Sequence, residues 1–149
     1  MPFASIIKEI SCSKENLIKM VLDIEKYPEF LPWCINAKIY NTINKDDYIE
    51  IIADLTIGKS FFCETYRSFV IYNKSADLIK VTNIEGPLKH LENNWYFKQI
   101  GKNSEVAFDI NFELKNKILN LLMTRSFDIG LKKIAGAFEK RALDLFKKT

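Results

Sequence analysis

Side chains able to catalyse a reaction are few in this sequence and widely separated. The chain has one histidine, His90, and three cysteines, Cys12, Cys34 and Cys63, which form no CxxC pair. No serine or cysteine lies in a nucleophile motif such as GxSxG, and no ligand spacing typical of a zinc site is present. The five glycines do not cluster into a phosphate-binding loop. The sequence therefore argues against an enzyme and predicts no catalytic residue and no metal site.

The carboxylates on the apparent strands have a structural interpretation. Glu64, Asp109 and Glu113 alternate with apolar neighbours, so we expect them to point outward to water. The cysteines are odd in number, and we expect them to be small buried hydrophobic residues without a disulfide.

Aromatic and aliphatic side chains are the more informative set. Trp95 and Phe97 share one side of a predicted strand with Leu91, and Trp33 lies in a segment rich in rings and prolines, residues 27–34. Such residues either fill a core or line a cavity, and the pattern alone leaves both interpretations open.

The elements that must position these residues follow from periodicity. Apolar residues recur every three or four positions through 116–149, which predicts one long amphipathic helix. Ser13 offers an N-cap for a helix over 14–24, and residues 27–34 should form a short helical turn or a rigid loop. Alternation over the rest predicts strands at 3–11, 49–57, 60–72, 78–85, 89–100 and 106–114, with a further strand beginning near Ile35.

This order predicts an α+β fold in which a curved antiparallel sheet of about six to seven strands wraps around the long C-terminal helix. One or two short helices follow the first strand. A length of 149 residues is ordinary for one domain, so we expect a single domain over 1–149. No apolar run is long enough to span a membrane and no secretory signal precedes the first strand, which favours a cytoplasmic protein.

The basic residues are unevenly distributed. The formal net charge is +3, too small to indicate a nucleic-acid-binding protein, and we expect no DNA partner. Lys132, Lys133, Lys140 and Arg141 all lie on the final helix. They form either a solvated helix face or a contact with anionic lipid or ribosomal RNA.

Three separated blocks resemble the signatures of the coenzyme Q-binding START-like family. They are Tyr27-Pro-Glu-Phe-Leu-Pro-Trp-Cys34, Gly86-Pro-Leu-Lys-His-Leu-Glu-Asn-Asn-Trp-Tyr-Phe97 and Ala137-Phe-Glu-Lys-Arg-Ala142. The resemblance spans nearly the whole chain, and the family includes a bacterial ribosome-association toxin. It implies a helix-grip fold of the START/Bet v1 type with an apolar cavity between sheet and helix.

The chain departs from the family pattern at two places. Leu88 follows Gly86-Pro87 where relatives usually carry Phe, and Phe69 replaces the basic residue that relatives place before Val70, with Arg67 two positions earlier.

The resemblance favours a cavity over a filled core. The predicted lining residues are Phe30, Trp33, Tyr66, Leu88, Leu91, Trp95, Phe97, Phe112, Met123, Phe127 and Leu131. Lys89, His90 and Asn93 are candidate polar contacts for a ligand head group, as is the Tyr66 hydroxyl.

The resemblance implies a non-catalytic carrier for a hydrophobic lipid, with ubiquinone or a similar polyprenyl lipid as the expected ligand, that supports respiration from the inner face of the membrane. No cofactor is required. The alternative is a toxin-like protein that binds the large ribosomal subunit and blocks subunit joining. A weaker alternative is a cyclase or aromatase, which would need a carboxylate or His90 directed into the cavity.

Overall fold

The protein is built on one seven-stranded antiparallel sheet. The computed structural model describes residues 3–59, 62–118, 120–121 and 127–146. The strands are β1 (Phe3–Ile10), β2 (Cys34–Asn44), β3 (Tyr48–Lys59), β4 (Phe62–Asn73), β5 (Leu78–Glu85), β6 (Leu88–Ile100) and β7 (Asn103–Leu114), in the order β1-β7-β6-β5-β4-β3-β2. Consecutive strands from β2 to β7 are neighbours, and β1 returns to pair with β7.

Two short helices follow β1. α1 (Lys14–Leu22) begins after Ser13, whose hydroxyl accepts a hydrogen bond from the Asn16 amide at 3.2 Å, as the N-cap prediction requires. α1 ends two residues earlier than predicted, and a 3₁₀-helix, η1 (Ile24–Glu29), carries the chain through Pro28. η1 overlaps the short helical turn predicted over 27–34 at residues 27–29, and the rest of that segment forms turns before β2 begins at Cys34.

The long C-terminal helix, α3 (Phe127–Leu145), has 19 residues and is about 28 Å long at ~1.5 Å per residue. The single helix predicted over 116–149 extends beyond it at both ends. Residues 117–118 and 120–121 are also helical, while residues 119, 122–126 and 147–149 lie outside the described residues.

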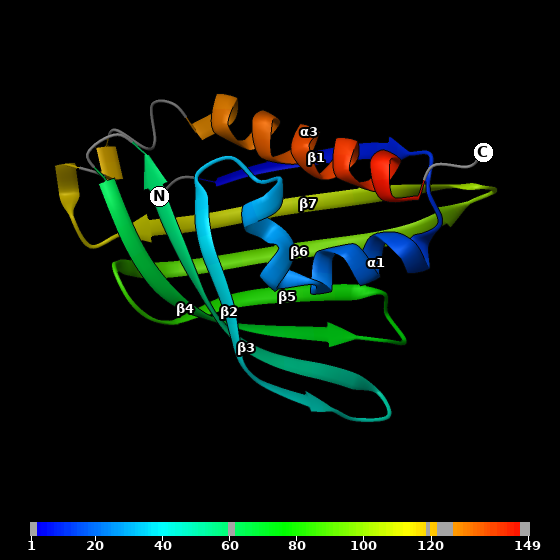
Figure 1. The fold of residues 1–149 in the computed structure, drawn as a ribbon, viewed down its shortest axis with the longest axis horizontal. Coiled ribbons are helices and arrows are strands. Elements are labelled where there is room, and N and C mark those ends of the chain that lie inside the picture. Colours follow the sequence, from blue (N-terminus) through cyan, green and yellow to red (C-terminus); the bar gives the residue numbers. More distant parts are fainter. Residues whose placement is uncertain (1–2, 60–61, 119, 122–126, 147–149) are drawn as a thin grey trace.

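The sheet curves strongly, and α1, η1 and α3 lie on its concave side (Figure 1). α3 contacts β1 and α1, α1 contacts β6, and η1 contacts β2. This arrangement confirms the predicted α+β helix-grip fold. No helix among the described residues combines the length and hydropathy needed to cross a bilayer.

Side chains along the strands alternate between buried and more exposed positions, as the two-residue period of the sequence predicts. Leu91, Asn93, Trp95 and Phe97 of β6 are buried, and their neighbours are more exposed. Aromatic residues occupy both faces of β4, so the sequence alone leaves the inward face of this strand open. In the structure Tyr66, Ser68 and Val70 point to the concave side.

Candidate ligand-binding cavity

A cavity of about 310 Å³ lies between the concave face of the sheet and the helices. Its lining comes from α1, η1, the 31–34 segment, strands β3 to β7 and α3. Almost all of the lining is apolar, and the volume is at the lower end of the range for small-molecule sites. The space is therefore suited to an apolar ligand or to part of a longer one.

Tyr66 is placed in the cavity by its strand and by a glycine turn. Gly86 has φ +130°, and a Cβ on it would lie 2.8 Å from the Tyr66 Cα. Only glycine allows this approach, so the Gly86-Pro87 block brings the β5–β6 turn against β4. Pro87 and Leu88 then line the cavity beside Tyr66.

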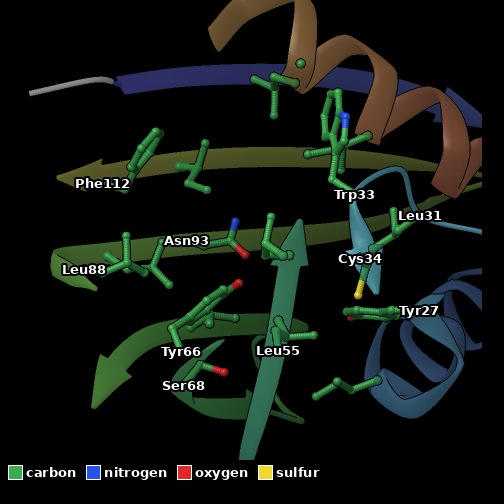
Figure 2. A pocket seen from close by; sticks show the side chains of 18 of the residues that line it. Tyr27, Leu31, Trp33, Cys34, Leu55, Tyr66, Ser68, Leu88, Asn93 and Phe112 are labelled. Carbon is green, nitrogen blue, oxygen red and sulfur yellow. The ribbon is translucent and has the colours of Figure 1, made fainter. Parts of the chain in front are cut away.

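The polar groups of the cavity are few and mostly satisfied. Asn93 donates from Nδ2 to the Asp109 carbonyl at 2.8 Å, and its Oδ1 accepts from Trp95 Nε1 at 2.9 Å. Ser68 Oγ donates to the Ala53 carbonyl at 3.3 Å. Figure 2 shows the Tyr66 hydroxyl directed toward the Asn93 side chain.

Burial determines the protonation of three groups in the lining. It raises the pKa of the Tyr66 and Tyr27 hydroxyls above their usual range, and it raises the pKa of the Cys34 thiol to about 11. Tyr27 donates its proton to the Val21 carbonyl. Tyr66 has no hydrogen-bond partner among the described residues, so its hydroxyl is available to a ligand as a neutral donor or acceptor.

Trp33 lies where the chain between η1 and β2 meets α3. Its φ is +66°, uncommon for a residue with a side chain, and its carbonyl accepts from the Gly58 amide at 2.8 Å. A Cβ on Gly130 would lie 3.6 Å from the Trp33 ring, which is an ordinary van der Waals distance, so α3 passes close to that ring. Trp33 thereby links β3, the 31–34 segment and α3 at the cavity.

Most of the described lining residues that the sequence predicted do surround this cavity. They are Trp33, Tyr66, Leu88, Leu91, Trp95, Phe112 and Leu131, together with Asn93. Met123 lies outside the described residues, and of Phe127 only the backbone is described.

Phe30 and Phe97 do not line the cavity. The Phe30 ring packs against Tyr27 and Phe138, with centroids 5.9 and 5.2 Å apart. Phe97 is buried further along β6 than Trp95, and the two parallel rings are 6.3 Å apart. Both are on the expected side of their elements, but neighbouring rings separate them from the open space.

Lys89 and His90 also lie outside the lining. The Lys89 ammonium is 3.4 Å from the Glu113 carboxylate, and its side chain is 68% exposed. The pairing of β6 with β7 shifts register between Leu88 and His90. This irregularity turns both Leu88 and Leu91 inward although they are three residues apart.

Glu64 lies at the rim of the cavity. It is exposed to water, as expected, and it also belongs to the lining, which the sequence did not predict. It is two residues before Tyr66 on β4, so it shares the inward face of that strand. The same period could have identified the inward residues Leu55 and Ile57 of β3 and Ile79 and Val81 of β5, which also line the cavity.

The basic residues of α3 differ from one another in exposure. Lys132, Lys133 and Lys140 are exposed. Arg141 is largely covered: its Nη2 donates to Glu29 Oε1 at 2.8 Å and its guanidinium lies 5.1 Å from the Phe30 ring centroid. Arg141 thus joins α3 to η1, and the three lysines form the accessible cationic surface.

No group of three or more histidine, cysteine or carboxylate side chains in the described part of the chain is arranged to hold a metal ion.

Comparison with known proteins identifies the family of this chain. Residues 12–139 match the family model described as polyketide cyclase/dehydrase and lipid transport. The ribosome association toxin RatA of Rickettsia prowazekii is 37% identical over 137 residues, covering 89% of this chain and 90% of the toxin. The mitochondrial coenzyme Q-binding protein COQ10 of Dictyostelium discoideum is 31% identical over 143 residues, covering 93% of this chain and 68% of that protein.

Solved structures share the fold. The 18 kDa protein CC1736 from Caulobacter crescentus superposes with a TM-score of 0.80 at 29% identity, covering 97% of this chain and 98% of that one. The Zhui aromatase/cyclase from Streptomyces superposes with a TM-score of 0.71 at 12% identity, covering 93% and 94%. At that identity the second likeness concerns the fold alone.

Proposed function

The chain belongs to the polyketide cyclase/dehydrase and lipid transport family, and we propose that it binds a polyprenyl quinone, such as ubiquinone, in the cavity between the sheet and α3. The observation that carries the proposal is an apolar cavity of about 310 Å³ into which one unpartnered hydroxyl, that of Tyr66, projects. The named relative COQ10 supports the choice of a quinone.

The apolar lining and Tyr66 have separate roles in this proposal. Each isoprenoid unit removed from water contributes about 2–3 kcal/mol before the costs of binding are deducted. The Tyr66 hydroxyl donates to a quinone carbonyl, and the Asn93 amide beside it is held in a fixed orientation by Trp95 and Asp109. Recognition needs no catalytic step, and His90 does not line the cavity.

The test is retention and rebinding of the quinone. The purified protein is extracted with organic solvent and the extract is analysed for quinones by mass spectrometry, and binding of decylubiquinone is then titrated. Tyr66→Phe should weaken that binding by about 2–10-fold, the net value of one hydrogen bond. Tyr96→Phe, on the outward face of β6, is the matched control. Absence of quinone from the extract together with no binding of decylubiquinone rejects the proposal.

Association with the large ribosomal subunit is the second candidate, and the comparisons favour it over the quinone carrier. RatA, the relative with the higher identity of the two reported, is named a ribosome association toxin. In the protein described here Lys132, Lys133 and Lys140 present exposed charge along α3, which would contact RNA phosphates.

Sedimentation with ribosomal subunits on sucrose gradients tests this candidate. Co-sedimentation should fall steeply as salt rises, because phosphate contacts release counterions. Lys132→Glu/Lys133→Glu should abolish it, whereas Lys98→Glu/Lys102→Glu, near the β6–β7 turn, makes the same charge change elsewhere. Equal co-sedimentation of both double variants would exclude α3 as the contact surface.

A further inference from the structure

The inward residues of β4 become more buried along the strand. Glu64 is exposed and Tyr66 is half-buried, whereas Ser68 and Val70 are 1% and 5% exposed. All four line the cavity. The row therefore runs from an entrance at Glu64 to a closed end at Val70, and a ligand entering along β4 passes the carboxylate before it reaches the Tyr66 hydroxyl.

The lining has one charged side chain among the described residues, and it is Glu64; no lysine, arginine or histidine is part of it. The nearest cation on the same strand, Arg67, points to the opposite face, where its Nε donates to Asp54 at 2.8 Å. Lys89 is paired with Glu113 outside the cavity. Glu64 makes no ion pair with any described residue.

These features distinguish lipids by the charge of their head groups. An ionised carboxylate or phosphate that leaves water needs a cation or several donors, and without them its burial costs several kcal/mol. Here it would also approach Glu64, a like charge. A neutral hydroxyl or carbonyl needs one hydrogen-bond partner, which Tyr66 supplies.

We infer that the cavity selects lipids with a neutral, oxygen-bearing head group and rejects anionic lipids such as fatty acids, with Glu64 acting as the charge filter at the entrance. This inference rests on the proposed lipid-binding function. It adds the class of ligand that is excluded and the residue that excludes it.

The experiment compares hexadecanol with hexadecanoate, which share chain length and differ in head-group charge. Binding to the full chain is followed below the micellar range by the fluorescence of Trp33 and Trp95, both of which line the cavity. The wild-type protein should bind the alcohol at least ~10-fold more tightly than the acid. Glu64→Lys should reduce that ratio by about 10-fold by strengthening acid binding.

Glu50→Lys is the matched control, because it makes the same charge change on β3 outside the cavity lining. It should leave the ratio unaltered. Equal affinity of the wild-type protein for both lipids, or a ratio that Glu64→Lys leaves unchanged, overturns the charge filter while lipid binding stands. Failure of both lipids and of decylubiquinone to bind rejects the proposed function itself.

Discussion

The space between the sheet and α3 has two ends that differ in packing. At the packed end four aromatic rings meet edge to face, with centroid distances from 5.0 to 5.9 Å; they are Tyr27, Phe30, Trp95 and Phe138. At the cavity end a separate cluster forms from Leu88, Leu91, Phe112 and Leu114. Both groups are apolar; Phe30 is partly buried and the other seven side chains are buried. All four members of the second group line the cavity, whereas in the first group Phe30 does not and its ring is covered by Tyr27 and Phe138.

The difference comes from what each group meets across the interface. Phe138 of α3 fills the space opposite Trp95, whereas Gly130, one of the α3 residues at the cavity, has no side chain to fill it. Cross-strand hydrogen bonds hold the sheet in place at both ends. We infer that the packed end supplies stability and thereby allows the cavity end to remain incompletely filled.

Truncation of Phe138 should have the largest effect. Phe138→Ala removes a ring that contacts Tyr27, Phe30 and Trp95, so the free energy of unfolding should fall by about 3–5 kcal/mol in urea denaturation. Phe112→Ala at the cavity end is the comparison, and its loss should be smaller by at least ~1 kcal/mol, because Phe112 packs in a small cluster with Leu88, Leu91 and Leu114 whereas Phe138 belongs to the main core. Equal losses would mean that the two ends are equally packed.

Filling the cavity should separate binding from stability. Leu55 lines the cavity from β3, and Leu55→Trp should lower decylubiquinone affinity at least ~10-fold while changing the free energy of unfolding by less than ~1.5 kcal/mol. Thr56→Trp, the next residue on the opposite face of the strand, is the control. A large loss of stability with Leu55→Trp would show that the space is not available to a bulky side chain.

Trp95 joins the two ends, and its indole nitrogen can be tested alone. Trp95→Phe keeps a ring but removes the donor to Asn93 Oδ1, so the protein should lose about 1–2 kcal/mol of unfolding free energy. Asn93→Leu in the same chain removes the unsatisfied acceptor and should recover part of the loss. A double-mutant cycle measures this coupling, and a coupling of zero would mean that the hydrogen bond adds nothing.

The ion pair between Glu29 and Arg141 should have the smallest effect. The hydrogen bond from Arg141 lowers the pKa of Glu29 below the ordinary value of a glutamate, so the pair stabilises the folded protein at every pH above that ordinary value. The stabilisation is lost as the pH falls through the lowered pKa. The melting temperature of Glu29→Gln should lie on the order of 1 °C below wild type at neutral pH and coincide with it once the pH is below the lowered pKa. A difference that persists in acid would contradict the assignment, and Glu15→Gln is the control.

Much of the fold was predictable because it depends on local periodicity. Alternation in residues 78–85 and 106–114 predicted β5 and most of β7, and the position of Ser13 predicted the start of α1. Trp33, Leu91, Trp95 and Phe112 were recognised as candidate lining residues because they fall in the family's blocks or on the inward period of a strand.

The remaining residues of the site depend on contacts between distant segments. The side-chain period of a strand determines which face a residue is on, but not what that face meets. Phe30 and Phe97 therefore lie on the predicted side of their elements, but they pack against other rings and do not line the cavity. Lys89 and His90 were predicted to contact a ligand head group, but they lie outside the lining. The register shift beside them arises from the pairing of β6 with β7, which the sequence of β6 alone does not determine.

Residue types, their spacing and the resemblance of three blocks were enough to define the strands, the amphipathic helix and the apolar character of the interior, since these depend on short-range geometry and on hydrophobicity. Tertiary structure alone decided which apolar residues fill the packed end, which surround the cavity, and that Glu64 belongs to its lining. The physical reason is that a cavity is an absence of packing between segments far apart in the chain, and only their three-dimensional arrangement determines where side chains fail to meet.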